Sequence, residues 1–196
     1  MTDLTPFKNH ILKKVPLTEA ELTEFMSFFT PLRIKKRQFV VQPNFVAKAR
    51  NYVIHGAFRG YVVGNAGEEH TIQFAIDDWW ISDYNSYIFQ QPATMFVVAV
   101  EDSWVMQIEY EKEAQLKALH HKYETFFRIT AERSTASMQR RLIANLTKTA
   151  EERFDEFEEK YHLIAERMPQ YAIASYLGMT SEYLSKLRNK RLSKKS

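Results

Sequence analysis

The sequence predicts an α+β fold with an N-terminal antiparallel β-barrel of the jelly-roll type, one long helix and a C-terminal helix-turn-helix. Three observations predict it. Short runs of β-branched and aromatic residues alternate with turn residues as far as Val100. From Glu109 onward the apolar residues follow helical spacing. Two short helical segments then flank Gly178. The expected domains are residues 1–118, 119–148 and 149–196.

The first expected helix begins near Thr18. Thr18 and Glu21 have the spacing of a capping box, in which each residue satisfies a backbone N–H of the other. Leu22, Phe25 and Phe29 continue the pattern on one face at helical spacing. A helix is therefore expected before the strands begin.

Short strands are expected next, because β-branched and aromatic residues gather in brief runs between turn residues. These runs are residues 38–42, 52–55, 57–63, 70–75 and 94–100. Asn65, Ala66 and Gly67 lie between two of the runs and are expected to form a hairpin tip. Regularly spaced short strands of this kind indicate an antiparallel barrel or sandwich.

A single stripe runs along the helix expected at residues 119–148, which contains neither proline nor glycine. Its members are Tyr123, Phe127, Thr130, Ser134, Met138, Leu142 and Leu146. A narrow stripe that is partly small and polar is typical of an interface between helices. We expect the stripe to be the seam of a homodimer, and the alternative is that it packs on the barrel of the same chain.

The segment from Pro169 to Arg188 has the pattern of a helix-turn-helix. Gly178 allows the left-handed backbone conformation that ends a helix. Thr180 or Ser181 can cap the helix that follows. Two short helices about a tight turn, the second of them polar and basic, form the arrangement that enters the major groove of DNA. An ordinary helical hairpin with a solvated basic face is the alternative.

Positive charge is concentrated at the C-terminal end of the sequence. The formal net charge is only +3, but six cations lie in the last eleven residues and no acid accompanies them. They are Lys186, Arg188, Lys190, Arg191, Lys194 and Lys195. A basic block of this kind suits a polyanionic partner such as DNA. A solubilising tail is the alternative for the last few residues.

Several classes of protein do not fit the sequence. Without cysteine there is no disulfide and no thiol-ligated zinc or iron–sulfur site. No run is long enough to span a membrane and no signal peptide is evident, so we expect a cytoplasmic protein with no membrane partner. His120 and His121 are adjacent on a helix and point apart, so they cannot share a metal ion. No nucleophile, phosphate-loop or metal motif is present, and we expect no metal, no cofactor and no enzyme activity.

Three segments, together with the order of the expected domains, resemble the Crp/Fnr family of bacterial transcription regulators, and most of all its short members from Bacteroidetes. The segments are residues 78–83, 150–154 and 167–178. The resemblance implies a sensor barrel like a cyclic-nucleotide-binding domain, followed by a dimerisation helix and a DNA-binding helix-turn-helix. It implies double-stranded DNA, a second copy of the chain and RNA polymerase as partners, together with a small-molecule effector of unknown identity.

The resemblance also implies where an effector would bind. Cyclic-AMP binders of the family hold the ribose with a Gly-Glu pair and the phosphate with an Arg-Ser or Arg-Thr pair. Asp83, at the glutamate position, remains able to accept a sugar hydroxyl, but Ala93 cannot supply the charge and fork of a guanidinium. Met138 is too bulky and apolar to replace a ligand-reading hydroxyl. The candidate pocket comprises Ser82, Asp83, Tyr84, Ala93, Thr94, Met138 and Gln139. We expect it to be empty or to take an apolar or neutral ligand, and not to bind cyclic AMP in the usual way.

The resemblance places Glu182 at the position of a base-contacting glutamate, and a carboxylate can accept a hydrogen bond from the amino group of cytosine. Lys186 lies one turn further and can reach a guanine or a phosphate. The expected DNA-binding residues are Gln170, Ser181, Glu182, Tyr183, Ser185, Lys186, Arg188 and Lys190. The residues after Arg191 are too few for the β-hairpin wing of the family. The alternative is therefore a module that binds a small molecule or a protein partner and whose DNA binding is weak or lost.

Overall fold

The computed structural model describes residues 3–193, so Lys194 and Lys195 of the expected basic tail lie outside the described residues. The chain divides into two compact units. The first is Met1–Gly60 with Phe74–Ser134, and the second is Tyr61–Gln73 with Thr135–Ser196. The division between the units falls inside the long helix. The boundaries at residues 118 and 148 expected from the sequence remain predictions.

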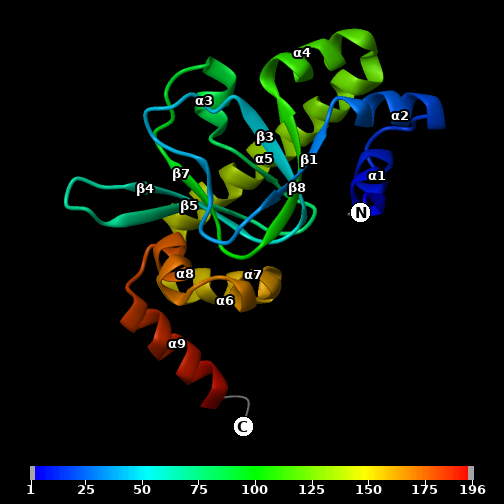
Figure 1. Cartoon of the computed structure of the whole chain (residues 1–196). Coiled ribbons are helices and arrows are strands. Elements are labelled where there is room, and N and C mark those ends of the chain that lie inside the picture. The colour runs from blue at the N-terminus through cyan, green and yellow to red at the C-terminus, as the bar shows by residue number, and fades with distance from the viewer. Residues whose placement is uncertain (1–2, 194–196) are drawn as a thin grey trace. The chain divides into compact units, whose positions relative to one another are not determined.

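Within residues 3–193, eight strands form two four-stranded sheets, with the orders β1-β8-β3-β6 and β2-β7-β4-β5 (Figure 1). The strands are β1 Thr30–Ile34, β2 Phe39–Val41, β3 Ala49–His55, β4 Phe58–Val63, β5 Glu69–Ala75, β6 Trp80–Ile81, β7 Phe96–Ala99 and β8 Ser103–Glu109. The strand pairs β1–β8, β2–β7, β3–β6 and β3–β8 are antiparallel.

The closed barrel expected from the sequence is wrong, because the two sheets do not join at their edges within residues 3–193. The edge strand β6 has only two residues and the edge strand β2 has three. Strands of this length offer too few hydrogen-bonding positions to close a barrel, which needs a continuous ladder around its circumference. The α+β class and the antiparallel pairing are confirmed.

The expected hairpin tip is confirmed between β4 and β5. The N–H of Gly64 donates to the carbonyl oxygen of Glu68 at 2.8 Å, which closes the turn. Gly67 adopts a φ of 85°, a value that glycine reaches without the steric cost of a Cβ atom. The five expected strand runs correspond to β2, β3, β4, β5 and β7, whereas β1, β6 and β8 were not expected.

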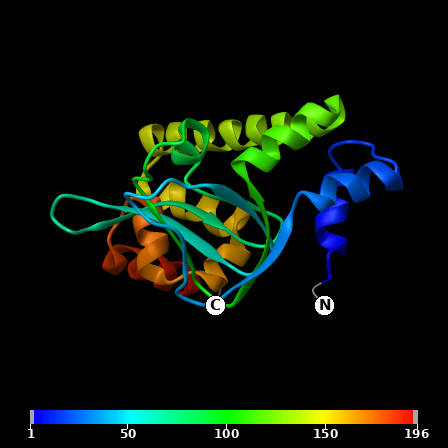
Figure 2. The ribbon, with the colours of Figure 1, turned by 45° about the horizontal axis from the view of Figure 1, so that its top comes forward.

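The helices are α1 Thr5–Leu12, α2 Glu19–Ser27, α3 Tyr84–Phe89, α4 Tyr110–Leu119, α5 His121–Thr147, α6 Ala150–Lys160, α7 His162–Arg167, α8 Gln170–Leu177 and α9 Ser181–Ser193. The capping box that begins α2 is confirmed. The backbone N–H of Thr18 donates to Glu21 Oε2 at 2.7 Å, and the N–H of Glu21 donates to Thr18 Oγ1 at 3.3 Å. Helix α5 runs for 27 residues without a break (Figure 2).

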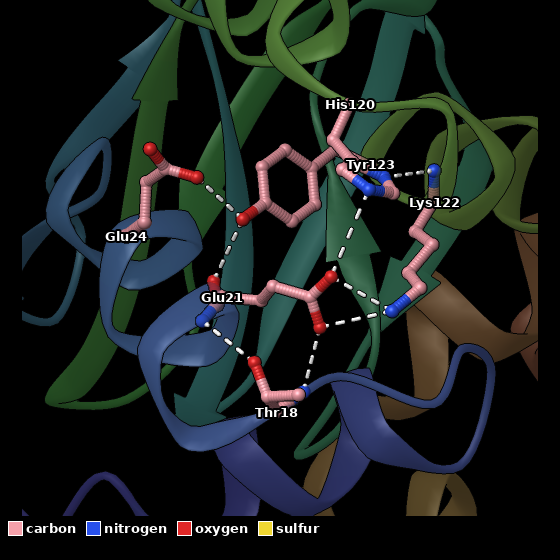
Figure 3. Close-up of polar contacts among 6 residues, drawn as sticks. All are labelled: Thr18, Glu21, Glu24, His120, Lys122 and Tyr123. Carbon is pink, nitrogen blue, oxygen red and sulfur yellow. Dashed lines mark hydrogen bonds and ion pairs between the residues drawn. The ribbon is translucent and has the colours of Figure 1, made fainter.

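The core of the first unit is an aromatic cluster in which α1, α2 and the beginning of α5 meet strands β3 and β8. The ring of Phe25 lies 5.1 Å from that of Phe126 and 5.4 Å from that of Tyr123, measured between centroids. Figure 3 shows that the Tyr123 hydroxyl donates to Glu24 Oε2 at 2.6 Å, with the carbonyl oxygen of Glu21 3.0 Å away. The first turns of α5 are therefore fixed to α2 of the same chain.

A polar cluster that the sequence did not predict is buried in the same unit. Arg50 Nε lies 2.5 Å from Glu113 Oε2, and the Tyr87 hydroxyl donates to the same oxygen at 2.9 Å. The Arg50 guanidinium lies 4.6 Å from the ring centre of Phe127 and 5.0 Å from that of Trp80. A buried charge is tolerated only when it is paired in this way. The cluster therefore fixes α4 to strand β3.

Candidate nucleic-acid interface

The turn between α8 and α9 has the backbone chemistry expected for it. Helix α8 ends at Leu177, and Gly178 follows with φ 68° and ψ 41°, in the left-handed region. The N–H of Met179 then donates to the carbonyl oxygen of Ala174 at 3.0 Å. Of the two expected caps, Thr180 is the one that acts, because the N–H of Tyr183 donates to Thr180 Oγ1 at 3.2 Å. Two helices joined by a tight glycine turn are thus confirmed.

Packing of α9 decides which of its residues face solvent. Leu184 is fully buried and Leu187 is 6% exposed, in the same unit as the buried Ile173 and Leu177 of α8. Tyr183, an expected DNA-binding residue, is 41% exposed. The outer surface of α9 is thus free to meet a partner.

The structure brings several expected DNA-binding residues onto this surface. Gln170, Glu182, Tyr183 and Lys186 are exposed, and Ser181 and Ser185 are half-buried. The Ser185 hydroxyl donates to Gln170 Oε1 at 3.4 Å, so the start of α8 and the outer face of α9 share one surface. Hydrogen bonds from its own backbone N–H and from Thr180 lower the pKa of the Glu182 carboxyl. Glu182 is therefore an ionised acceptor at neutral pH.

An acidic stripe on α6 pairs with the basic end of α9. Its members Glu151, Asp155 and Glu158 share one helix face, and each meets a different cation of α9. The pairs are Lys190 with Glu151 at 2.7 Å, Arg191 with Asp155 at 3.5 Å and Arg188 with Glu158 at 3.4 Å. This stripe was not predicted from the sequence. Lys186 is the exception among the expected cations: it is exposed and has no ion pair within residues 3–193.

The candidate effector pocket is organised by Asp83 in a way the sequence did not indicate. Asp83 is 2% exposed and caps α3. Its Oδ1 accepts from the N–H of Ser86 at 3.0 Å, and its Oδ2 accepts from the N–H of Thr94 at 3.1 Å. Asp83 thus has one backbone donor on each carboxylate oxygen, and the expectation that it accepts a sugar hydroxyl stays a prediction.

The other pocket residues divide into two groups. Ser82 and Ala93 are buried beside Asp83: the Ser82 hydroxyl donates to the carbonyl oxygen of Ala49 at 2.9 Å, and the Ala93 N–H donates to that of Phe45 at 2.9 Å. Tyr84 and Thr94 are exposed. Met138 and Gln139 lie in the second unit and are exposed on α5. Ser82, Asp83 and Ala93 are therefore buried, and each is hydrogen-bonded to another residue of the first unit.

The expected dimer seam requires a correction at its beginning. Tyr123 is fully buried and Phe127 is 2% exposed, both in the core of their own chain, so neither can contact a partner. The stripe appeared continuous because both of its halves have the same spacing, but α1 and α2 already cover the first half. Thr130, half-buried, donates its hydroxyl to the carbonyl oxygen of Phe126 at 2.8 Å. Ser134, Met138 and Leu142 are exposed and remain candidates for the seam.

Four large apolar side chains are exposed along the second half of α5. Met138 is 53% exposed, Leu142 59%, Ile143 52% and Leu146 77%. Contiguous apolar surface of this kind marks an interaction site more often than a solvated face.

Two features are absent from residues 3–193. No group of three or more histidine, aspartate or glutamate side chains is placed to hold a metal ion. No helix there combines the length and the apolar character that crossing a membrane requires.

Comparison with known proteins identifies the class of the fold. No family model and no curated protein matches the chain. Among solved structures, FixK2 from Bradyrhizobium japonicum superposes with a TM-score of 0.73 at 15% identity, covering 85% of both chains. The c-di-GMP responsive global regulator CLP from Xanthomonas campestris gives 0.71 at 13% identity, covering 90% of this chain and 93% of its own. A Crp/Fnr-family regulator from Eubacterium rectale gives 0.68 at 15% identity, covering 90% and 85%.

The fold is therefore that of the Crp/Fnr regulators. At these identities the comparisons establish the fold alone.

Proposed function

We propose that the chain is a homodimeric, DNA-binding transcription regulator of the Crp/Fnr type, and not an enzyme. One observation carries the proposal. The α8–α9 pair turns at Gly178 and buries Leu184 and Leu187, while the outer face of α9 presents Glu182 and Lys186 to solvent. A helix with an apolar inner face and a polar outer face, set on a second short helix, fits the major groove. The solved structures of the same fold are transcription regulators.

The chemistry of the outer face favours direct recognition of bases. Glu182 is an acceptor that suits the amino group of cytosine, and Lys186 is a donor that suits the acceptors of guanine or a phosphate oxygen. Gln170 and Ser185 lie at the edge of this face and can donate to the DNA backbone near the start of α8, where helix N-termini favour phosphates. We infer that Glu182 and Lys186 read sequence, and that Gln170 and Ser185 fix the register.

The acidic stripe of α6 limits how much the remaining cations of α9 contribute to DNA affinity. Arg188 and Lys190 must exchange Glu158 and Glu151 for phosphates if they are to bind DNA. Exposed ion pairs are worth only about 0–1 kcal/mol, so the exchange is feasible. A cation that must first break an ion pair with a protein carboxylate gains less free energy from binding a phosphate than an unpaired cation does. We infer that Lys186 contributes more affinity than Arg188 or Lys190.

Two copies of the chain are needed to place two α9 helices on the DNA. The exposed apolar residues of α5, from Met138 to Leu146, supply the surface for a two-fold contact between helices. Such a dimer reads two half-sites about 34 Å apart, or one helical turn of DNA.

The effector is not expected to be a cyclic nucleotide, because Asp83 occupies the backbone donors of the turn and Ala93 supplies no cation. RNA polymerase and a small-molecule effector remain predicted partners, and the cytoplasm remains the predicted location.

The experiment is fluorescence anisotropy of labelled DNA from the region upstream of the protein's own gene, at several salt concentrations. Lys186→Ala is expected to weaken binding and to lower the salt slope by about one if Lys186 contacts a phosphate. Glu182→Ala is expected to relax discrimination by ~1–3 kcal/mol at one base pair in each half-site. Glu159→Ala, which removes an exposed acid of α6 outside the acidic stripe, is the matched control. Unchanged affinity and salt slope in both test variants would favour the alternative of a partner-binding module.

A further inference from the structure

A cavity of about 160 Å³ lies within the second unit, between the C-terminal half of α5, helix α6 and the end of α8. Four cations line it: Arg140, Arg141, Arg153 and Lys160. Glu156 is the one acid in its lining. The described lining therefore carries three more positive than negative charges.

The single acid does not neutralise the arginines. Glu156 accepts from Lys148 Nζ at 2.8 Å and from Lys160 Nζ at 2.5 Å, and these hydrogen bonds lower its pKa to about 2. Among the described residues no carboxylate pairs with Arg140, Arg141 or Arg153. Arg153 instead donates its Nε–H to the carbonyl oxygen of Leu177 at 3.0 Å. The cavity thus has an excess of positive charge, and its three arginines have no carboxylate partner among the described residues.

Arg141 is the most constrained of these cations. It donates to the carbonyl oxygens of Thr71 at 3.1 Å and Tyr176 at 3.2 Å, and also to that of Ile72. Its Nε is buried without a hydrogen-bond partner. Burial lowers the pKa of Arg141, which means that the surroundings disfavour its charge. A bound anion would compensate that cost.

The other walls of the cavity are aromatic. The Phe157 ring lies 5.8 Å from the Tyr176 ring and 5.8 Å from the Tyr161 ring, measured between centroids. The Arg141 guanidinium lies 3.9 Å from the ring centre of Tyr176. A flat apolar ligand can stack on such surfaces while its charged end meets the arginines.

We propose that this cavity is a binding site for a small organic anion with an aromatic body, such as a compound of the size of benzoate. A cavity of about 150 Å³ in another protein accommodates benzene, so the volume fits one ring with one small charged group. The ligand would contact α5, α6 and α8 together, and would join the helix before the Gly178 turn to the long helix. The site does not depend on the proposed DNA binding and is tested without DNA.

The first test is calorimetric titration of the full chain with benzoate, with two matched compounds. Benzamide keeps the ring without the charge, and acetate keeps the charge without the ring. Benzoate is expected to bind at least about tenfold more tightly than either. No heat and no shift of tyrosine NMR signals with benzoate up to about 20 mM, where even millimolar binding is visible, overturns the proposal. Equal affinity for benzoate and acetate also overturns it, because the site is then a simple anion patch.

The second test places the ligand. Arg140→Gln removes an exposed cation with no described partner, and Ala144→Leu fills part of the cavity without changing its charge. Both are expected to weaken benzoate binding by about tenfold or more. Arg133→Gln, at an exposed position of the same helix that does not line the cavity, is the control and should bind as the unmodified chain does. Benzoate binding that neither test variant weakens places the ligand elsewhere and overturns the proposal.

Discussion

The two halves of α5 have the same sequence spacing and opposite surroundings. In the first half Phe126 is fully buried and Phe127 is 2% exposed, whereas in the second half Leu142 is 59% and Leu146 is 77% exposed. The difference comes from elsewhere in the chain, since α1 and α2 supply the aromatic residues that cover the first half. A large apolar side chain gains about 1.5–3 kcal/mol when it leaves water. The first half has already gained this within one chain, whereas the apolar side chains of the second half remain exposed, and we propose that a second copy of the chain covers them.

The largest expected effect is on the free energy of unfolding and arises in the buried first half of α5. Phe126→Ala is expected to lower the free energy of unfolding by ~3–5 kcal/mol, because it leaves a cavity among packed rings. Urea denaturation at low protein concentration measures it. Leu146→Ala is the control, and we expect it to change the monomer's stability by less than about 0.5 kcal/mol, as exposed positions do. Similar losses in both variants would remove the contrast between the halves.

The next largest expected effect is on the association of two copies of the chain. Leu142→Glu is expected to weaken the dimer by at least about a hundredfold, because the two-fold brings two charges into an apolar seam. Sedimentation velocity over a concentration series measures it. Leu163→Glu makes the same change at a leucine that is 50% exposed on α7, and it should leave association unchanged. A monomer at every concentration in the unmodified chain would contradict the assignment of the exposed half.

A smaller effect concerns a buried polar residue of the first unit. Asp83→Ala is expected to cost ~1–2 kcal/mol of stability, because it removes the cap of α3 and leaves the N–H groups of Ser86 and Thr94 without their acceptor. Asp155→Ala, on the exposed surface of α6, is the matched control. The same samples should give no heat with cyclic AMP. Micromolar binding of cyclic AMP by the unmodified chain would contradict the expectation that the pocket does not bind it in the usual way.

The smallest expected effect depends on pH and arises beside Phe126. Burial and the nearby cations Lys14, Lys13 and Arg133 lower the pKa of His10 from 6.5 to about 3. His10 of the unfolded chain therefore becomes protonated near pH 6.5, whereas His10 of the folded chain stays neutral until the pH is near 3. This contribution to stability is complete above pH 6.5 and is lost as the pH falls toward 3. Between pH 6.5 and 5.5 the loss is about 1 kcal/mol. His10→Gln should reduce the dependence of the free energy of unfolding on pH between 6.5 and 5.5. An unchanged pH dependence would show that other groups cause it.

Local chemistry was predictable from the sequence. The capping box of Thr18 and Glu21 and the turn at Gly178 involve residues within a few positions of one another, and both are confirmed. Strand β8 was missed because Ser103–Glu109 runs directly into α4 with no turn residue to mark its end. Helix α1 was missed because it has only eight residues and two buried ones, too few to show a period.

Long-range partners were not predictable. A stripe on a helix does not tell which segment covers it, and the cover of Tyr123 comes from α2, about a hundred positions earlier in the sequence. The pairing of α6 acids with α9 cations has the same origin, because it joins charges some thirty positions apart, such as Glu158 and Arg188. The role of Asp83 also required the fold, since Thr94 reaches its carboxylate only through the turn after α3.

The central claim is that two copies of this chain read DNA with α9. Selection of bound sequences from a random DNA pool by the full chain tests it most directly. The account predicts one enriched inverted repeat, with half-site centres about 10–10.5 base pairs apart, that loses its preference at one symmetric position in Glu182→Ala. No enriched sequence, or an enriched site without two-fold symmetry, would contradict it.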